Sequence, residues 1–233
     1  MNGKRIGRRT VALRTPPSVL SFANIGGRME GHGPLAKYFD ELCEDSFFGE
    51  KTWEKAESAM QERVLRRALE QAGLAPDELD YVLAGDLLNQ CIGSSFAARE
   101  QHLPFFGLYG ACSTMGEGLA LASMTLDGGF GEWAAVVVSS HFCTAERQYR
   151  FPLEYGGQRT PTSQWTVTGG GAVVVAGAAA QTPDQAGPWI QAAAIGTIED
   201  KGIKDANNMG AAMAPAAYAT LTAHFQDTGR EPD

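Results

Sequence analysis

The sequence predicts an α/β protein with a mainly parallel sheet covered by helices on both faces. Buried strand patterns alternate with helical patterns along most of the chain, as they do in proteins built from strand–helix–strand units. Polar or sulfur-bearing side chains follow three of the predicted strands: Asp86, Cys112 and His141. A turn pattern, G-x-x-P-D, closes two separate helical stretches. It indicates a duplicated molecule, with chance recurrence of an ordinary turn after a helix as the alternative.

The first half of the chain is predicted as strand, loop, helix, strand and short helix. Residues 11–22 favour a strand or hairpin, and the stretch NIGGRMEGHGP favours a glycine-rich loop. A helix is expected over Lys51–Ala72, ended by Gly73. The stretch DYVLAGD is a buried strand ending at Asp86, and a short helix covers Ser94–Gln101. The long helix has one apolar stripe: Trp53, Ala56, Met60, Val64 and Ala68.

The stretch LPFFGLYGACSTMGEGLALASMTLDGG predicts a strand, a sharp turn and a helix in direct succession. Residues Leu103–Leu108 are apolar and rich in aromatics, and small residues follow them. Ser113 or Thr114 can cap the next helix, which the glycines at 128–129 end. Cys112 therefore lies at a strand-to-helix elbow.

Two more strands complete the predicted sheet. The first is WAAVVVSSH, which ends at His141, and the second is GGGAVVVAG. The polar stretch between them, FCTAERQYRFPLEYGGQRTPTSQ, is expected to form a long loop.

The elbow gives Cys112 a chemical environment of its own. Backbone N–H groups in the first turn of a helix are unpaired and carry partial positive charge, so a thiol there ionises more easily, and a carboxylate or oxyanion can bind there. The alternative is a small, inert residue that only fits the turn. Spacing leaves both interpretations open.

Ligands of open α/β sheets bind beyond the carboxyl ends of the strands, so Asp86, Cys112 and His141 are candidates for one pocket. Asp86 alternatively makes a helix cap or loop hydrogen bond, and His141 alternatively is a buried histidine bonded to backbone. Arg147 and Arg150 are the nearest cations for an anionic ligand, with surface solvation as their alternative.

Composition excludes several classes of protein. The net charge of −8 and the pI near 5.1 argue against a nucleic-acid-binding protein. The basic N-terminus lacks the apolar segment of a signal peptide, and no apolar run is long enough to span a bilayer. The four cysteines are scattered, which indicates reduced thiols in an intracellular compartment and no metal site: Cys43, Cys91, Cys112 and Cys143.

Nucleotide and hydrolase motifs are absent too. GGGAVVV lacks the Lys-Ser/Thr of a P-loop, and the glycines at 116 and 118 do not complete a dinucleotide fingerprint. Thr114 breaks the G-x-C-x-G pattern of a hydrolase elbow. After these exclusions, the remaining class is an α/β protein with a Cys on an elbow, duplicated if the two G-x-x-P-D copies, GLAPD and GREPD, mark a repeat.

GACST on an elbow, followed by DGGF and TGGGAVVVAG, resembles the thiolase-like fold of ketoacyl synthases and thiolases. Longer motifs resemble one branch, the stage V sporulation protein AD family: GHGPLAKYFDEL, KTWEKAE, LAGDLLNQ, FGLYGACST, SSHFCTAERQYRFPLEYGGQRTPTSQWTVTGGGAVVV and MGAAMAPAA. The resemblance implies two thiolase-like halves with mixed sheets, which we expect at 1–178 and 179–233. The second half is expected to be incomplete, because the family continues further.

The resemblance implies a protein that binds dipicolinic acid, alone or with calcium, and works with membrane proteins at the forespore or spore inner membrane. It also implies a homodimer. The residues expected to meet the ligand are Asp86, Cys112, Ser113, His141 and Arg147, with Phe142 available to stack on its ring. No metal site of the protein's own and no nucleic-acid partner are expected.

Two other functions stay open. One is an acyl-transfer or condensing enzyme with Cys112 as acyl-accepting nucleophile. In such enzymes the activating His and the Asn or second Cys come from the later part of the fold, so no residue here can be given those roles. The other is a scaffold that docks membrane partners and binds nothing small.

Overall fold

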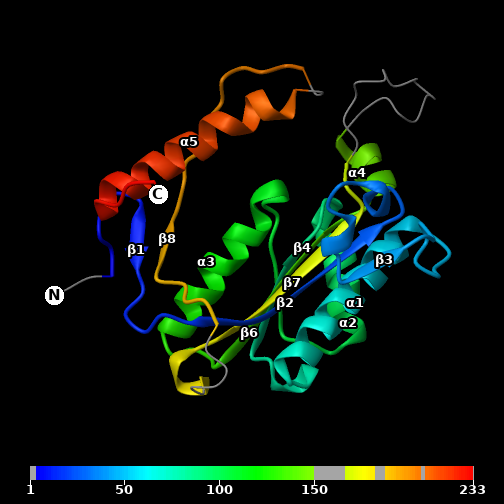
Figure 1. Cartoon of the computed structure of the whole chain (residues 1–233), viewed down its shortest axis with the longest axis horizontal. Coiled ribbons are helices and arrows are strands. Elements are labelled where there is room, and N and C mark those ends of the chain that lie inside the picture. Colours follow the sequence, from blue (N-terminus) through cyan, green and yellow to red (C-terminus); the bar gives the residue numbers. More distant parts are fainter. Residues whose placement is uncertain (1–3, 150–165, 182–186, 206–207, 233) are drawn as a thin grey trace.

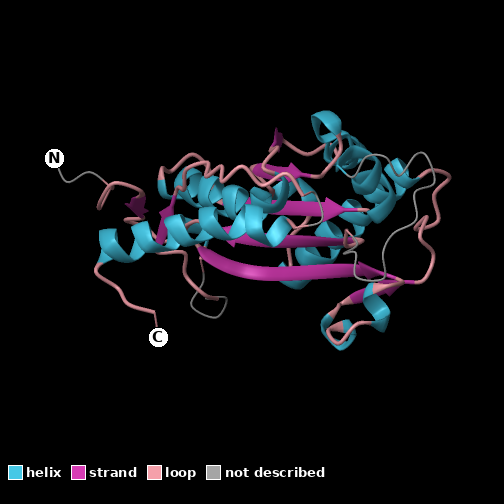
Figure 2. Ribbon diagram, turned by 90° about the horizontal axis from the view of Figure 1, so that it is seen from above, coloured by secondary structure: helices cyan, strands magenta, loops and turns pink. Residues whose placement is uncertain are grey.

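A computed structural model describes residues 4–149, 166–181, 187–205 and 208–232, without the side chains of 146–149. Within these residues, six strands form the main sheet in the order β3-β2-β7-β6-β4-β5 (Figure 1). Figure 2 shows its strands running side by side. The strands are β2 (Ser18–Gly27), β3 (Glu41–Cys43), β4 (Tyr81–Gly85), β5 (Phe105–Gly107), β6 (Trp133–Ser140) and β7 (Gly169–Ala176).

Helices cover both faces of this sheet, as the sequence predicts. Helices α1 (Trp53–Ala72) and α2 (Ile92–Glu100) pack on one face, and α3 (Thr114–Asp127) packs on the other (Figure 1). One hydrophobic core joins the apolar stripe of α1 to the sheet, and a second joins α3 to the opposite face. Gly73 ends α1 with a left-handed φ of 71°, confirming the predicted helix end.

The sheet is mixed rather than mainly parallel. Strand β4 runs parallel to both β5 and β6, but β7 runs antiparallel to both β6 and β2. Gly169 at the start of β7 lies opposite Ser140 at the end of β6, so the long connection returns the chain to the edge where it left. The first part of that connection is not a loop but helix α4 (Phe142–Tyr149).

The expected glycine-rich loop is also shorter than its sequence suggests. Residues 24–27 belong to β2, and only the later part forms turns. A Cβ atom on Gly26 would lie 2.9 Å from the Phe39 ring, and one on Gly27 would lie 2.9 Å from Thr168. These glycines allow close packing within a strand instead of a turn.

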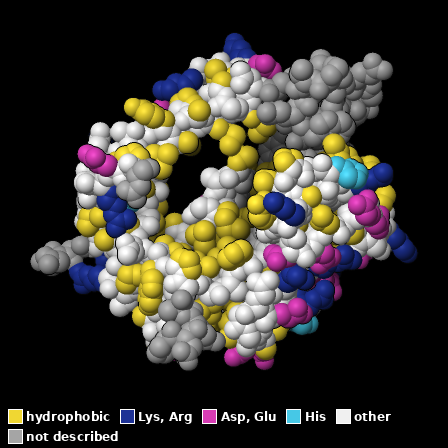
Figure 3. Space-filling model, viewed as in Figure 1, with side chains coloured by type: hydrophobic (Ala, Val, Ile, Leu, Met, Phe, Trp, Pro, Cys, Tyr) yellow, Lys and Arg dark blue, Asp and Glu magenta, His cyan; other side chains and the backbone are white. Residues whose placement is uncertain are grey.

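A second, smaller unit lies beside the main sheet. Strand β1 (Thr10–Ala12) pairs with β8 (Ala192–Ala194), and helix α5 (Met209–Thr228) packs on both. Strand β1 therefore pairs across the predicted division at 178/179, which stays a prediction. The space-filling view is hollowed between α5 and the main body, and hydrophobic side chains gather there (Figure 3).

Helix α5 ends in the same way as α1. Gly229 has a left-handed φ of 66°, so both G-x-x-P-D copies begin with a left-handed glycine cap. The Asp227 carboxylate in the last turn accepts the N–H groups of Arg8, Arg9 and Thr10 at 2.8–2.9 Å. These hydrogen bonds, that of Arg9 first, lower the pKa of Asp227 to about 2, so the tie between α5 and the N-terminal segment persists across the ordinary pH range.

Candidate functional site

Cys112 lies at the predicted elbow and its side chain is exposed. Strand β5 leads through buried Leu108 into a single 3₁₀ turn, Ala111–Ser113, and α3 begins at Thr114. Ala111 has a left-handed φ of 47°, which is unusual for a residue with a side chain. The chain therefore reverses sharply at this point and presents the thiol to solvent.

The elbow lies directly against the end of β4 because Gly85, at that end, has no side chain. A Cβ atom on Gly85 would lie 2.3 Å from the carbonyl oxygen of Leu108 and 2.7 Å from Thr114 Cγ2. Behind the elbow, the buried Cys91 thiol donates to the same carbonyl at 2.9 Å, and burial raises its pKa. Position 91 is thus a structural thiol, whereas position 112 is an accessible one.

The predicted caps of α3 are wrong in detail. Ser113 Oγ donates to the carbonyl of Gly110, and Thr114 Oγ1 donates to the carbonyl of Ala111, both at 2.8 Å. Both hydroxyls satisfy carbonyls of the preceding turn, so neither accepts an N–H group of the helix, and no side chain caps α3. The N–H group of Thr114, the first residue of α3, is bonded to the carbonyl of Ala111. Donors for a ligand next to Cys112 would therefore come from the following residues of the first turn.

Asp86 lies behind the elbow with only 2% of its surface exposed. Its carboxylate accepts Leu88 N–H at 2.8 Å, Ser94 N–H at 2.7 Å and Ser94 Oγ–H at 2.6 Å. These bonds shape the turn between β4 and α2, which is the alternative role predicted for Asp86, a loop hydrogen bond. Direct contact between Asp86 and a ligand stays a prediction.

His141 is completely buried at the junction of β6 and α4. Its Nδ1 accepts Cys143 N–H at 3.2 Å, which assigns the hydrogen to Nε2, 2.8 Å from the carbonyl oxygen of Ser46. The ring stacks on Trp53 and Phe142 at centroid distances of 6.4 and 5.2 Å. This is the backbone-bonded histidine of the alternative interpretation, and both nitrogens are occupied by backbone groups.

The two arginine candidates cannot be placed as side chains. Arg147 belongs to α4, but its side chain is outside the described part, and Arg150 lies wholly outside the described residues. The expectation that Arg147 approaches a ligand at this edge of the sheet stays a prediction.

A buried polar network that the sequence did not predict lies beneath this edge of the sheet. Glu57 on α1 is fully buried, and its carboxylate accepts Ser139 Oγ–H at 3.0 Å and Thr144 Oγ1–H at 2.8 Å. Burial, and then the charge of Asp86, raise the pKa of Glu57 to about 7, although the hydrogen bonds from the two hydroxyls lower it. The sequence signal that could have identified Glu57 was its position among the buried apolar residues of α1.

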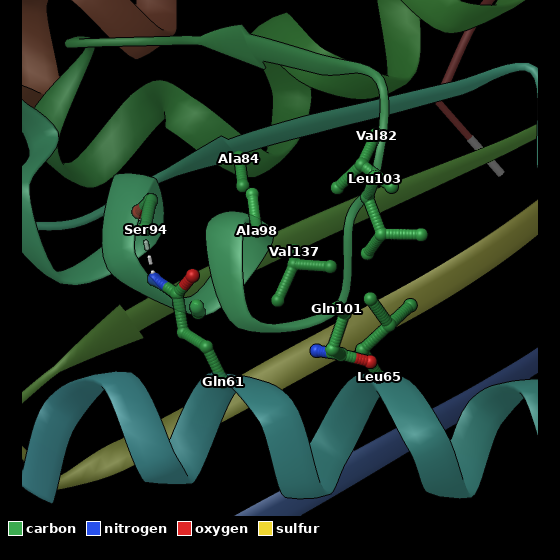
Figure 4. A pocket seen from close by; sticks show the side chains of 10 residues that line it. Gln61, Leu65, Val82, Ala84, Ser94, Ala98, Gln101, Leu103 and Val137 are labelled. Carbon is green, nitrogen blue, oxygen red and sulfur yellow. Dashed lines mark hydrogen bonds between the residues drawn. The ribbon is translucent and has the colours of Figure 1, made fainter. Parts of the chain in front are cut away.

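Gln61, one turn further along α1, connects this network to Asp86. It also lines a small cavity between α1 and α2, where its amide approaches Ser94 (Figure 4). The cavity volume is about 10 Å³, room for about one water molecule, so it does not hold an aromatic ligand.

In the described ranges, no group of His, Cys, Asp and Glu side chains could hold a metal ion. None of the described helices is long and apolar enough to cross a membrane.

The fold and the cysteine elbow define a thiolase-like protein. A 3-oxoacyl-(acyl carrier protein) synthase III (FabH) from Xanthomonas oryzae superposes with a TM-score of 0.61 at 14% identity, over 95% of this chain and 75% of that protein. A cerulenin-bound OleA from Xanthomonas campestris superposes with a TM-score of 0.60 at 16% identity, over 93% and 72%. At these identities the similarity shows the fold alone.

Within that fold the family is specific. Residues 7–233 match the family described as stage V sporulation protein AD, and the chain belongs to this family. It is 43% identical to the stage V sporulation protein AD of Bacillus subtilis strain 168 over 230 residues. The chain spans 66% of the length of that relative.

Proposed function

We propose that the chain binds dipicolinic acid, alone or as its calcium chelate, at the Cys112 elbow. In this proposal it is the peripheral component of a complex of membrane proteins at the forespore or spore inner membrane that moves the acid into the spore. Membership of the sporulation family supports the biological setting. The chemistry of the elbow supports the ligand.

One observation carries the proposal: an exposed cysteine beside the uncapped N-terminus of a 14-residue helix. Dipicolinate is a flat dianion, and free N–H groups at a helix N-terminus bind carboxylates. Among the described residues no hydrogen bond reaches the Cys112 sulfur, and His141 is engaged with backbone on both nitrogens. In this proposal the remaining N–H groups of the first turn of α3 hold the anion, and the described residues provide no base for the thiol.

The other expected residues would complete this site from the same edge of the sheet. Arg147 would supply charge for a carboxylate, and Phe142 an aromatic face. Asp86 would repel a free dianion, whereas calcium between the two would turn that repulsion into attraction. Binding is therefore expected to be tighter with calcium than without it.

Cys112→Trp is expected to weaken dipicolinate binding at least tenfold, because the indole fills the space in front of the α3 N-terminus. Cys112→Ala is expected to bind within about threefold of the wild type, since backbone N–H groups hold the ligand. Isothermal titration calorimetry with and without calcium measures both, and benzene-1,3-dicarboxylate, which lacks the ring nitrogen, is the control ligand.

Cys43→Trp is the matched control, because Cys43 is a partly exposed thiol on β3 at the far side of the sheet. It is expected to bind like the wild type. No heat of binding with the wild type, or equal weakening by both tryptophans, overturns the proposal.

An acyl-transfer enzyme is the second candidate, favoured by the same exposed thiol on a condensing-enzyme fold. It predicts a covalent acyl adduct at Cys112 after incubation with acyl-CoA, detected by intact mass and absent in Cys112→Ala. The binding protein is expected to keep its unmodified mass.

The proposal includes a homodimer formed through the free edge of β5. Strand β5 ends the main sheet, and aromatic side chains near it are about half exposed, including Phe106 at 53%. An open, apolar strand edge favours pairing with another chain. Phe106→Asp is expected to shift sedimentation from dimer to monomer, whereas Leu35→Asp, beyond the opposite edge, leaves the dimer intact. A wild-type monomer contradicts this part.

A further inference from the structure

The buried network contains two carboxylates joined through a single amide. Gln61 Nε2 donates to Ser94 Oγ at 2.9 Å and to Ser139 Oγ at 2.8 Å. Each serine passes its own hydrogen on to a carboxylate, Ser94 to Asp86 and Ser139 to Glu57. Gln61 Nε2 also lies 3.3 Å from the carbonyl oxygen of Gly85, a longer contact than those to the two serines. With the amide nitrogen facing both serines, each hydroxyl accepts from Gln61 and gives its single hydrogen to its carboxylate.

This direction determines where Glu57 can hold a proton. A proton on Oε1 would point at Ser139, whose hydroxyl already accepts from Gln61 and donates toward that same oxygen. A proton on Oε2 would point at Thr144 Oγ1, 2.8 Å away. The proton therefore belongs on Oε2.

Thr144 can accommodate that proton without losing a hydrogen bond. Its hydroxyl lies 2.8 Å from Glu57 Oε2 and 3.0 Å from the carbonyl oxygen of His141, but it has one hydrogen to give. When Glu57 is ionised, the hydroxyl donates to Glu57. When Glu57 is protonated, the hydroxyl accepts from Glu57 and donates to His141.

We propose that Glu57 and Thr144 form a proton-operated switch that couples the charge of a buried carboxyl on α1 to the first turn of α4. Loss of the proton gives a charge-assisted bond between the two helices, and its gain moves the Thr144 hydrogen to the His141 carbonyl. The same carbonyl accepts Ala145 N–H at 3.0 Å, the first backbone bond of α4.

The surroundings of Glu57 provide no compensating cation among the described side chains. Asp86 faces it through the network, and Glu54 lies one turn earlier on α1; both disfavour its ionised form. The strands packed on α1 near it, β2, β6 and β7, contain no charged residue, and α2 carries Arg99 and Glu100 only at its far end. At the α4 junction the titratable groups are the backbone-bonded His141 and Cys143, and the side chains of 146–149 are not described.

The test is a nuclear magnetic resonance titration of the full chain from pH 4 to 9. The carboxyl carbon of Glu57, identified by its loss in Glu57→Gln, is expected to titrate with a midpoint near 7. The amide proton of Ala145 is expected to shift with the same midpoint, because its acceptor becomes shared. This readout involves no ligand, so its failure is distinct from failure of the proposed function.

Two variants separate a switch from a merely buried carboxyl. Thr144→Ser keeps the hydroxyl and is expected to keep the Ala145 shift, whereas Thr144→Val is expected to abolish it while Glu57 still titrates. The proposal is overturned by a Glu57 midpoint near the ordinary pKa of 4.5. It is equally overturned by a flat Ala145 response in the wild type, or by a response that survives in Thr144→Val.

Discussion

Gly85→Ala is expected to destabilise the chain by about 3 kcal/mol or more and to displace the Cys112 elbow. Overpacking a buried site usually costs about 1–3 kcal/mol, and the upper end applies here because the obstacle is backbone. The new Cβ would lie 2.3 Å from the carbonyl oxygen of Leu108. The strands cannot separate easily, since Leu108 N–H donates to Ala84 at 2.8 Å and Gly85 is in register with Val138 of β6.

Chemical denaturation measures the loss of stability, and calorimetry with dipicolinate measures the damage to the elbow. Gly116→Ala is the matched control, because a Cβ there meets nothing within 4 Å. In the first turns of α3 an alanine is expected to be neutral or stabilising by up to about 1 kcal/mol. Equal denaturation midpoints for the two variants would show that Gly85 does not set the approach of β4 to the elbow.

Local patterns were sufficient to predict most of the sheet and the helices beside it. The stripe of α1, its end at Gly73 and the elbow at Cys112 depend on neighbouring residues in the sequence, and all three are confirmed. Helix α4 was missed because its polar residues resemble a loop. The direction of β7 was missed because it depends on where a long connection returns.

The interior of the site could not be predicted because its partners are distant in sequence. Glu57 bonds residues 82 and 87 positions away. Asp86 is the exception, because Leu88 and Ser94 satisfy it from two and eight positions away, which is the local role that the sequence offered. Ser113 and Thr114 are typical caps, yet the 3₁₀ turn before α3 offers nearer carbonyls to both hydroxyls. Sequence therefore located the edge of the sheet that carries the polar groups, but not which of them face outward.

Glu57→Gln is expected to stabilise the chain by about 3 kcal/mol at pH 9 and to leave it nearly unchanged at pH 4. The pKa of Glu57 rises from an ordinary 4.5 to about 7 on folding, and each pKa unit corresponds to about 1.4 kcal/mol. The native state holds this proton more tightly than the unfolded chain. The stability that this bound proton adds to the native state is thus complete below pH 4.5 and is lost as the pH rises through 7. The amide resembles the protonated acid and has no charge to bury.

Denaturation at intervals from pH 4 to 9 is expected to show a wild-type stability that falls across this window and a Glu57→Gln stability that falls much less. Burial also raises the pKa of Glu62, so part of the slope remains in the variant. Glu70→Gln, an exposed position on the same helix, is expected to keep the wild-type slope. The carboxylate of Asp227 has a pKa near 2, so its titration falls below this window and does not mask the effect. Parallel curves for the wild type and Glu57→Gln would mean that the buried carboxyl is ionised in the native chain throughout, at a cost that other groups offset.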